Sequence, residues 1–224
     1  VVNAGRRGGK TSNLLAPKMV HAAWTTPLPD LKPGEIARAV VISPDLDLSE
    51  AAFNYAVGIC ESSPVLRRAV VKKNTEQIVL RRPDGKLCEI VTGAASRGGA
   101  AARSRTCVFV GLDEAAFFYA ADGHTVNDRD IYNAALGTLK FVAGSQCWIV
   151  STPWVEEEGL MEELIRDYWG PAGAEAGVVV AARISSYALR GMVDDGSLRE
   201  GLDEDTYRRE ILSVPLPRGT RGYF

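Results

Sequence analysis

Hydrophobic positions along the chain alternate between short continuous runs and stretches with helical spacing. Continuous apolar runs occupy positions 39–43, 107–112, 147–150 and 178–182, and such runs are typical of buried parallel strands. Helical spacing of apolar residues occurs at 10–24, 47–60, 156–169 and 203–212. We therefore predict an α/β fold with a mostly parallel β-sheet flanked by helices on both faces.

Turn-forming residues refine this prediction. Positions 77–80 and 87–91 flank Pro83-Asp84-Gly85-Lys86, which predicts a hairpin. Residues 1–4 have the composition of a strand that leads into a glycine-rich turn. Ligands of parallel α/β sheets bind at the carboxyl ends of strands, so we expect the functional site in the loops after the apolar runs.

The loop after the first strand carries a phosphate-binding pattern. Its sequence, Ala4-Gly5-Arg6-Arg7-Gly8-Gly9-Lys10-Thr11, matches GxxxxGK[ST] except that Ala4 replaces the first glycine. Lys10 is expected to reach the β- and γ-phosphates and Thr11 to hold Mg²⁺. The alternative is a glycine turn before a helix with a chance Lys-Thr pair. The expected nucleotide-binding residues are Gly5, Arg6, Arg7, Gly8, Gly9, Lys10, Thr11 and Ser12.

Two further loops follow apolar runs and carry polar groups. The run 107–112 ends in Asp113 and Glu114, and carboxylates at the end of a buried strand are costly unless they bind something. We expect Asp113 to act in the Mg²⁺ shell and Glu114 to be the general base for water; solvated acids at a strand end are the alternative. The run 147–150 ends in Ser151-Thr152-Pro153, whose hydroxyls either contact the reacting groups or cap the strand.

An arginine-rich loop at 94–105 precedes Asp113-Glu114. Phosphoryl transfer gains from an arginine inserted by the same or a neighbouring subunit, and the candidates are Arg97, Arg103 and Arg105. A solvated basic loop or a DNA-facing patch is the alternative.

Composition excludes a disordered chain and a membrane span. Hydrophobic residues make up 46%, enough for a core, and no apolar run approaches the roughly 20 residues that cross a bilayer. Cys60, Cys88, Cys107 and Cys147 lack metal-ligand spacing, so we expect core thiols.

The net charge of −2 hides an uneven distribution. Residues 64–110 carry +7, whereas residues 111–210 carry −11. A basic block suits contacts with phosphates or with a neighbour's nucleotide, and an acidic half suits the complementary face of a ring. This hypothesis requires Arg67, Arg68, Lys72, Lys73, Arg81 and Arg82 to share a surface.

The loop motifs, in this order, resemble the ATPase domain of viral large terminases. The match is carried by Gly5–Thr11, Leu112-Asp113-Glu114-Ala115-Ala116 and Ser151-Thr152-Pro153, supported by Ser43-Pro44 and by Ser63-Pro64-Val65-Leu66-Arg67. The resemblance implies a P-loop NTPase fold of the RecA/ASCE type. It also implies that Lys10, Glu114, Arg103 and Thr152 are catalytic, with Arg103 as the finger across a subunit interface and Thr152 in a coupling motif. Thr11 and Asp113 become the metal ligands, with ATP and Mg²⁺ bound.

The same resemblance implies the domain organisation and the partners. Residues 1–212 form the ATPase domain, with a lid-like extension from about 155, and residues 213–224 lead toward a nuclease domain outside this chain. The family's adenine-contacting segment is missing upstream of the loop, so we expect a trimmed start. The implied partners are double-stranded DNA, portal protein, the small terminase subunit and further copies of the chain in a ring, a pentamer on the procapsid or a monomer in isolation. The implied location is the cytoplasm of the infected host cell, with no membrane.

Two other functions remain open at this point. A helicase-type or other nucleic-acid-dependent P-loop ATPase shows a similar order of motifs, although a second motor lobe does not fit in 224 residues. A non-catalytic nucleotide switch is the other, and the intact Asp113-Glu114 pair argues against it.

Overall fold

The computed structural model describes residues 1–95, 105–118, 128–155 and 159–217. Contacts divide the chain into two compact units. The larger unit contains residues 11–113 and 118–148, and the terminal unit contains residues 1–10, 114–117 and 149–224. Each unit is described by itself.

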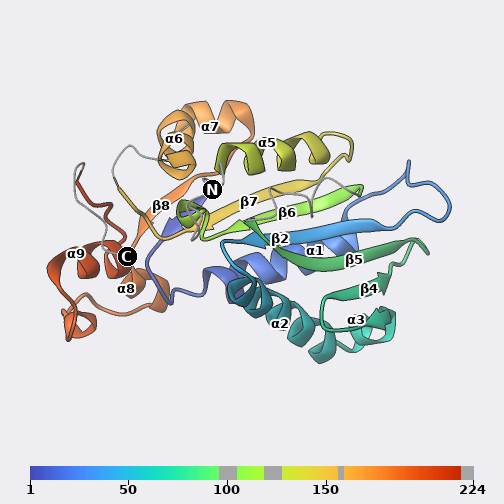
Figure 1. The fold of residues 1–224 in the computed structure, drawn as a ribbon, viewed down its shortest axis with the longest axis horizontal. Coiled ribbons are helices and arrows are strands. Elements are labelled where there is room, and N and C mark those ends of the chain that lie inside the picture. The colour runs from blue at the N-terminus through green and yellow to red at the C-terminus, as the bar shows by residue number, and fades with distance from the viewer. Residues whose placement is uncertain (96–104, 119–127, 156–158, 218–224) are drawn as a thin grey trace. The chain divides into compact units, whose positions relative to one another are not determined.

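Five of the described strands lie wholly within the larger unit (Figure 1). They are β2 (Ala37–Ser43), β3 (Val70–Lys73), β4 (Gln77–Arg81), β5 (Leu87–Ala94) and β6 (Cys107–Asp113), in the order β3-β4-β5-β2-β6. Strand β2 pairs in parallel with β5 and β6, with Val40 opposite Val91 and Val110. All residues of β6 are buried. Strands β2 and β6 are therefore those that the continuous apolar runs at 39–43 and 107–112 predicted.

Among the described residues of the larger unit, antiparallel pairing is confined to β3, β4 and β5. Strand β4 pairs antiparallel with both of its neighbours, so the predicted β4–β5 hairpin is confirmed. Its turn contains Gly85 at a φ of +80°, which glycine adopts without a Cβ penalty.

Helices lie on both sides of the larger unit's strands. Helices α1 (Ala16–Thr25) and α2 (Leu46–Ser62) lie on one side, and α5 (Asp128–Leu139) lies on the other (Figure 1). The predicted helix at 10–24 opens as a π-helical turn over Lys10–Leu15. Pro17 follows in the first turn of α1, and because proline has no N–H, the regular ladder cannot extend back from it.

Three elements of the larger unit were not predicted. They are α5, the short helix α3 (Pro64–Ala69) and strand β3. Ser63 caps α3 by accepting a hydrogen bond from the Leu66 N–H, and Pro64 occupies the first turn. The Ser63-Pro64 pair is a local signal for a helix start. The helix has only six residues, however, which is too short to show a periodic pattern of apolar positions.

The terminal unit has its own parallel strands. Strand β1 (Val2–Ala4) pairs in parallel with β8 (Ala181–Ile184) and with the last residues of β7 (Gln146–Ser151). The predicted strand at 178–182 therefore lies a few residues later than expected. The bounds of the unit's helices are α6 (Gly159–Tyr168), α7 (Pro171–Ala176), α8 (Ser186–Arg190) and α9 (Glu204–Thr206).

The predicted helix at 203–212 is only partly regular. Asp203 caps α9 through the Thr206 N–H, as expected for an acidic helix start, but a π-helical turn follows over Tyr207–Ile211. A 3-10 turn at Ala115–Phe117 and another at Ser197–Arg199 complete the unit's described elements.

The expected fold class is confirmed. Most strand pairs are parallel, and helices cover both faces of the larger unit's strands. Among the described residues, no helix has the length and apolar character needed to cross a bilayer.

Candidate nucleotide-binding site

The glycine-rich loop follows the end of β1, as the motif requires. Lys10 is buried, and its Nζ donates to the carbonyl oxygens of Ala4 and Gly5 at 3.0 and 3.1 Å. The same ammonium lies 3.6 Å from Glu114 Oε1. A buried ammonium requires such partners. The two carbonyl oxygens and the Glu114 carboxylate hold the Lys10 ammonium beside the start of the glycine-rich loop.

Close packing explains why the loop needs its small residues. A Cβ on Gly5 would meet Ser186 Oγ at 2.4 Å and the Ile211 carbonyl at 2.7 Å, and one on Gly8 would meet Leu189 at 2.1 Å. Gly9 has a φ of +77°. Ala4, which departs from the motif, ends β1 and is not among the residues with positive φ, so its side chain causes no backbone strain.

Asp113 and Thr11 meet within the larger unit. Asp113 is the buried last residue of β6, and its Oδ2 accepts a hydrogen bond from Thr11 Oγ1 at 2.8 Å. A hydroxyl and a carboxylate are the hard oxygen ligands that Mg²⁺ prefers. Among the described residues, no group of three or more His, Cys, Asp or Glu side chains gathers as a metal site. This donor set fits a magnesium ion that takes its other ligands from phosphates and water.

Glu114 is fixed by the end of β7 within the terminal unit. Its Oε2 accepts hydrogen bonds from Ser151 Oγ at 3.3 Å and from the N–H and Oγ1 of Thr152, both at 3.1 Å. Glu114 has a φ of +49°, unusual for a residue with a side chain. Ser151 Oγ also accepts from the Ala116 N–H at 3.1 Å. Strained backbone held by several hydrogen bonds is common at functional sites.

The structure therefore brings the predicted residues together in two clusters. Lys10, Glu114 and Thr152 form one in the terminal unit, and Thr11 with Asp113 forms the other in the larger unit. The clusters are joined along the chain, because Lys10-Thr11 and Asp113-Glu114 are consecutive residues. Ser12 is half-buried and donates to the Asn13 side chain at 3.2 Å.

The arginine candidates are only partly described. Arg97 and Arg103 lie outside the described residues. Arg105 precedes β6, whereas Asp113 ends it, so at roughly 3.3 Å per residue the two lie about 25 Å apart. Arg105 is thus at the wrong end of β6 to serve Asp113 of its own chain.

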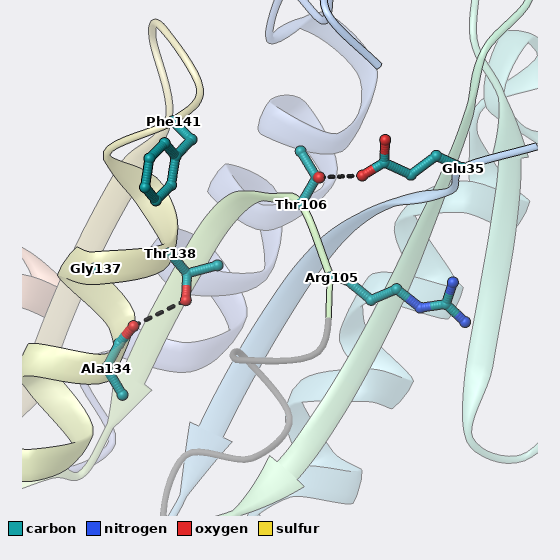
Figure 2. A pocket seen from close by; sticks show the side chains of 7 residues that line it. All are labelled: Glu35, Arg105, Thr106, Ala134, Gly137, Thr138 and Phe141. Atoms are coloured by element: carbon teal, nitrogen blue, oxygen red, sulfur yellow. Dashed lines mark hydrogen bonds between the residues drawn. The ribbon is translucent and has the colours of Figure 1, made fainter. Parts of the chain in front are cut away.

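A cavity of about 520 Å³ lies beside Arg105, at the end of the strands away from Asp113. Figure 2 shows Phe141 and Thr138 on one side, Glu35 held by the Thr106 hydroxyl on the other, and the Arg105 guanidinium directed away from Phe141. The Arg105 Nε instead lies 3.5 Å from Glu89 Oε1. None of the predicted nucleotide-binding residues lines this cavity.

The basic block is not one surface. Arg82 is buried, and its guanidinium donates to the carbonyls of Ala23 and Thr26 at 2.8 and 2.5 Å. Lys73 pairs with Glu61 of α2, and Lys72 precedes it in β3, so the two side chains leave opposite faces of the strand. The prediction that six cations share a surface is therefore wrong, because Arg82 caps α1 and the lysines diverge.

Sequence reasoning also missed the partners of Arg6 and Arg7. Both arginines are exposed. Arg6 Nε lies 3.7 Å from Glu210 Oε2, and the Arg7 carbonyl accepts from Arg190 Nη2 at 3.3 Å. Glu210 is 204 positions from Arg6 in the sequence, and no local pattern joins residues so far apart.

The mostly parallel α/β sheet and the glycine-rich loop after β1 place the chain in the P-loop fold class. No family sequence model matches the chain, and no curated protein sequence matches it. The solved structures identify the fold more closely. A mutant form of the large-terminase ATPase domain of Thermus phage P74-26 has a TM-score of 0.66 at 16% identity, over 96% of this chain and 88% of that one.

Two other solved structures agree. A large terminase from a thermophilic bacteriophage has a TM-score of 0.65 at 13% identity, over 96% of this chain and 48% of that one. The HK97 bacteriophage large terminase has a TM-score of 0.57 at 14% identity, over 82% of this chain and 34% of that one. The chain thus spans about half or less of these two proteins and has the fold of a phage large-terminase ATPase domain, which confirms the expected resemblance at the level of the fold.

Proposed function

We propose that this chain is the ATP-hydrolysing motor domain of a terminase large subunit, which drives double-stranded DNA into a viral procapsid. The observation that carries the proposal is the Glu114 carboxylate, which is held between Lys10 and Thr152 after β6 and β7. The likeness in fold to phage large-terminase ATPase domains supports it, and a large terminase from a thermophilic bacteriophage was solved in complex with ADP.

Each cluster has a distinct part in the proposed reaction. The loop N–H groups and Lys10 bind the β- and γ-phosphates of ATP. Thr11 and Asp113 are the residues that would hold Mg²⁺, which neutralises phosphate charge when bound. Water attacks the γ-phosphorus as Glu114 accepts a water proton, and the bond to the β–γ bridging oxygen breaks to leave ADP and inorganic phosphate. Charge on the transferred group is stabilised by Lys10 and by an arginine from a neighbouring subunit, for which Arg103 is the candidate.

Thr152 is the proposed coupling residue. Its N–H and hydroxyl both donate to Glu114 Oε2. A shift in the position or protonation of the Glu114 carboxylate would therefore alter two hydrogen bonds at the end of β7. Hydrolysis would thereby reach the segment that follows β7, and the proposed result is movement of DNA.

The wider assembly follows from the same proposal. The partners are double-stranded DNA, portal protein, the small terminase subunit and further copies of the chain in a ring, in the cytoplasm of the infected host. The ATPase domain comprises residues 1–212, and residues 213–224 lead toward a nuclease domain.

Replacement of the base tests this function. Glu114→Gln keeps a hydrogen-bonding side chain but cannot take a proton, so we expect ATP hydrolysis to fall about 10²- to 10⁴-fold with ATP binding retained. Phosphate release measured with and without double-stranded DNA gives the rate, and Glu175→Gln, at an exposed glutamate of α7, is the control. Near-normal turnover in Glu114→Gln would remove Glu114 from this role.

Two outcomes point to the alternative functions. Strand separation by the active protein would favour a helicase-type ATPase. No phosphate release from the unmodified chain, even with DNA and portal protein present, would favour a nucleotide switch.

A further inference from the structure

Ser43, the last residue of β2, carries a buried hydroxyl that makes no hydrogen bond within the part of the chain that the structure describes. Pro44 follows it, and a proline has no N–H to offer. Nearly all buried polar groups in folded proteins have a partner, and an exception calls for an explanation such as a bound ion or its water. The Ser43 hydroxyl therefore points to a polar ligand at the end of β2.

A second buried serine nearby shows the usual arrangement. Ser49 lies near the start of α2, and its Oγ is 3.0 Å from the Asp45 carbonyl oxygen and 2.9 Å from the Gly93 carbonyl oxygen of β5. Gly93 pairs with Ile42, the residue before Ser43. Two serines at the same end of these strands thus differ, because Ser49 has partners in the protein and Ser43 does not have one among the described residues.

The strand register places Ser43 beside Asp113. Ile42 pairs with Leu112 in the parallel β2–β6 ladder. The next residues, Ser43 and Asp113, end the two strands and are therefore neighbours. Adjacent strands lie about 4.8 Å apart, and the side chains of paired residues leave the same face of the sheet. The Ser43 hydroxyl and the Asp113 carboxylate consequently share one face.

That face is the one covered by the helix after the glycine-rich loop. A Cβ on Gly111 would meet Leu15 Cδ1 at 2.9 Å and Val41 Cγ2 at 3.1 Å, so both strands present these positions to Leu15, which ends the π-helical turn before α1. Side chains alternate along a strand, and Ser43 and Asp113 come two residues after Val41 and Gly111. Both side chains therefore face this helical turn.

The same turn supplies the second oxygen of the candidate magnesium site. Thr11 Oγ1 donates to Asp113 Oδ2 at 2.8 Å, and these are the two residues that would hold Mg²⁺. A protein-bound Mg²⁺ keeps several of its waters, and a divalent cation polarises the water that it binds. A buried hydroxyl next to Asp113 therefore has a hydrogen-bond partner available when the hydrated ion is bound.

We propose that Ser43 is a positioning residue of the magnesium site, which hydrogen-bonds to a water of the bound ion without ligating the ion itself. Groups in this outer position orient the ligands of a metal and raise its affinity. The hydroxyl gains its partner when the hydrated cation binds with nucleotide. This inference rests on the proposed function in one respect, namely that the glycine-rich loop binds a nucleotide together with Mg²⁺.

The affinity for Mn²⁺ tests this assignment. Mn²⁺ prefers the same octahedral oxygen ligands as Mg²⁺, and the EPR signal of free Mn²⁺ reports its binding to the chain saturated with ADP. We expect Ser43→Ala to weaken Mn²⁺ binding about tenfold, as the loss of an outer-shell partner does. Affinity for ADP measured in EDTA should stay unchanged. Ser49→Ala removes a buried serine hydroxyl that has protein partners, and this matched control should leave Mn²⁺ affinity unchanged.

The stability of the metal-free chain is a second readout. Ser43→Ala removes a hydroxyl without a partner among the described residues, so the thermal midpoint in EDTA should rise or stay unchanged. Ser49→Ala removes a satisfied hydroxyl and should lower the midpoint by about 2–4 °C. When Mn²⁺ and ADP are added, the midpoint should rise more in the parent chain than in Ser43→Ala, because tighter binding stabilises the folded state more.

The outcomes separate this inference from the proposed function. Equal Mn²⁺ affinity in the parent chain and Ser43→Ala would overturn the inference. A lower midpoint of Ser43→Ala in EDTA would also overturn it, because the hydroxyl would then stabilise the fold without the metal. Normal ATP hydrolysis by the parent chain alongside either result would leave the proposed function intact. A selective loss of Mn²⁺ affinity in Ser43→Ala, in a chain that never hydrolyses ATP, would support the inference and refute the motor function.

Discussion

The Arg82 side chain connects two elements that lie far apart in the sequence, β4 and α1. Its guanidinium satisfies carbonyl oxygens at the end of α1, from a position just after β4. Helix ends leave carbonyls without partners, and here an arginine from another element supplies the donors. The charge distribution suggested a phosphate contact for Arg82, but its guanidinium instead stabilises the end of α1.

Replacement of this arginine should be strongly destabilising. Arg82→Met keeps most of the aliphatic length but removes every donor, which leaves buried carbonyls and Asp84 without this partner. We expect a loss of about 3 kcal/mol in the free energy of unfolding, measured by urea denaturation. Arg81→Met, at the adjacent exposed position, is the control and should change it by less than about 0.5 kcal/mol. Equal effects of the two substitutions would contradict the capping role.

Individual site residues were predictable only where the motif is local. Lys10, Thr11, Asp113 and Glu114 follow from short patterns next to apolar runs. Glu210, Ser186 and Leu189 were not predictable, because they approach the loop only through the path of the chain, about 200 positions away. Arg6 therefore belongs to a recognisable sequence motif, whereas its partner Glu210 belongs to none.

At the level of elements, the apolar runs predicted the strands well and the helix ends poorly. The run 107–112 is within one residue of β6, because burial on both faces demands continuous apolar residues. Helix starts depend instead on one capping side chain. The periodicity placed the start of α2 at Asp47, but the structure makes Asp45 the N-cap, with Oδ1 accepting from the Leu48 N–H at 2.8 Å.

The two aspartates at the start of α2 form a matched pair for a test. Asp45→Ala removes the capping acceptor and should lower the free energy of unfolding by about 1 kcal/mol. Asp47→Ala removes only a favourable charge in the first turn and should cost about 0.3–0.5 kcal/mol. Both positions are exposed, so neither substitution leaves a cavity. If urea denaturation shows a larger loss of unfolding free energy for Asp47→Ala than for Asp45→Ala, the capping role of Asp45 is contradicted and a helix start at Asp47 is favoured.

At the scale of the whole molecule, three of the four cysteines are core residues. Cys60, Cys88 and Cys107 are buried, and among the described residues they belong to no metal-binding group. Burial raises the pKa of Cys60 to about 11 and the pKa values of Cys88 and Cys107 to about 12, from 9.0. The dominant cause is desolvation, which disfavours a thiolate in the interior.

These raised pKa values predict a loss of stability in mild alkali. Below pH 9 the thiols are protonated in both states and contribute no pH dependence. Above pH 9 they ionise in the unfolded chain but stay protonated in the folded one, so the free energy of unfolding falls by up to about 1.4 kcal/mol per pH unit for each thiol, until pH passes the folded pKa.

The double variant Cys88→Ala/Cys107→Ala isolates this contribution. Urea denaturation from pH 7 to 10 should give parallel lines for variant and parent up to about pH 8, because neither thiol yet ionises in the unfolded chain. Above pH 9 the parent should lose stability more steeply than the variant, by up to about 2.8 kcal/mol per pH unit once both unfolded-state thiols are ionised. The lower absolute stability expected of the variant does not affect this comparison, since only the slopes are compared. Equal slopes above pH 9 would mean that water reaches these two thiols in the folded chain, contrary to their position in β5 and β6.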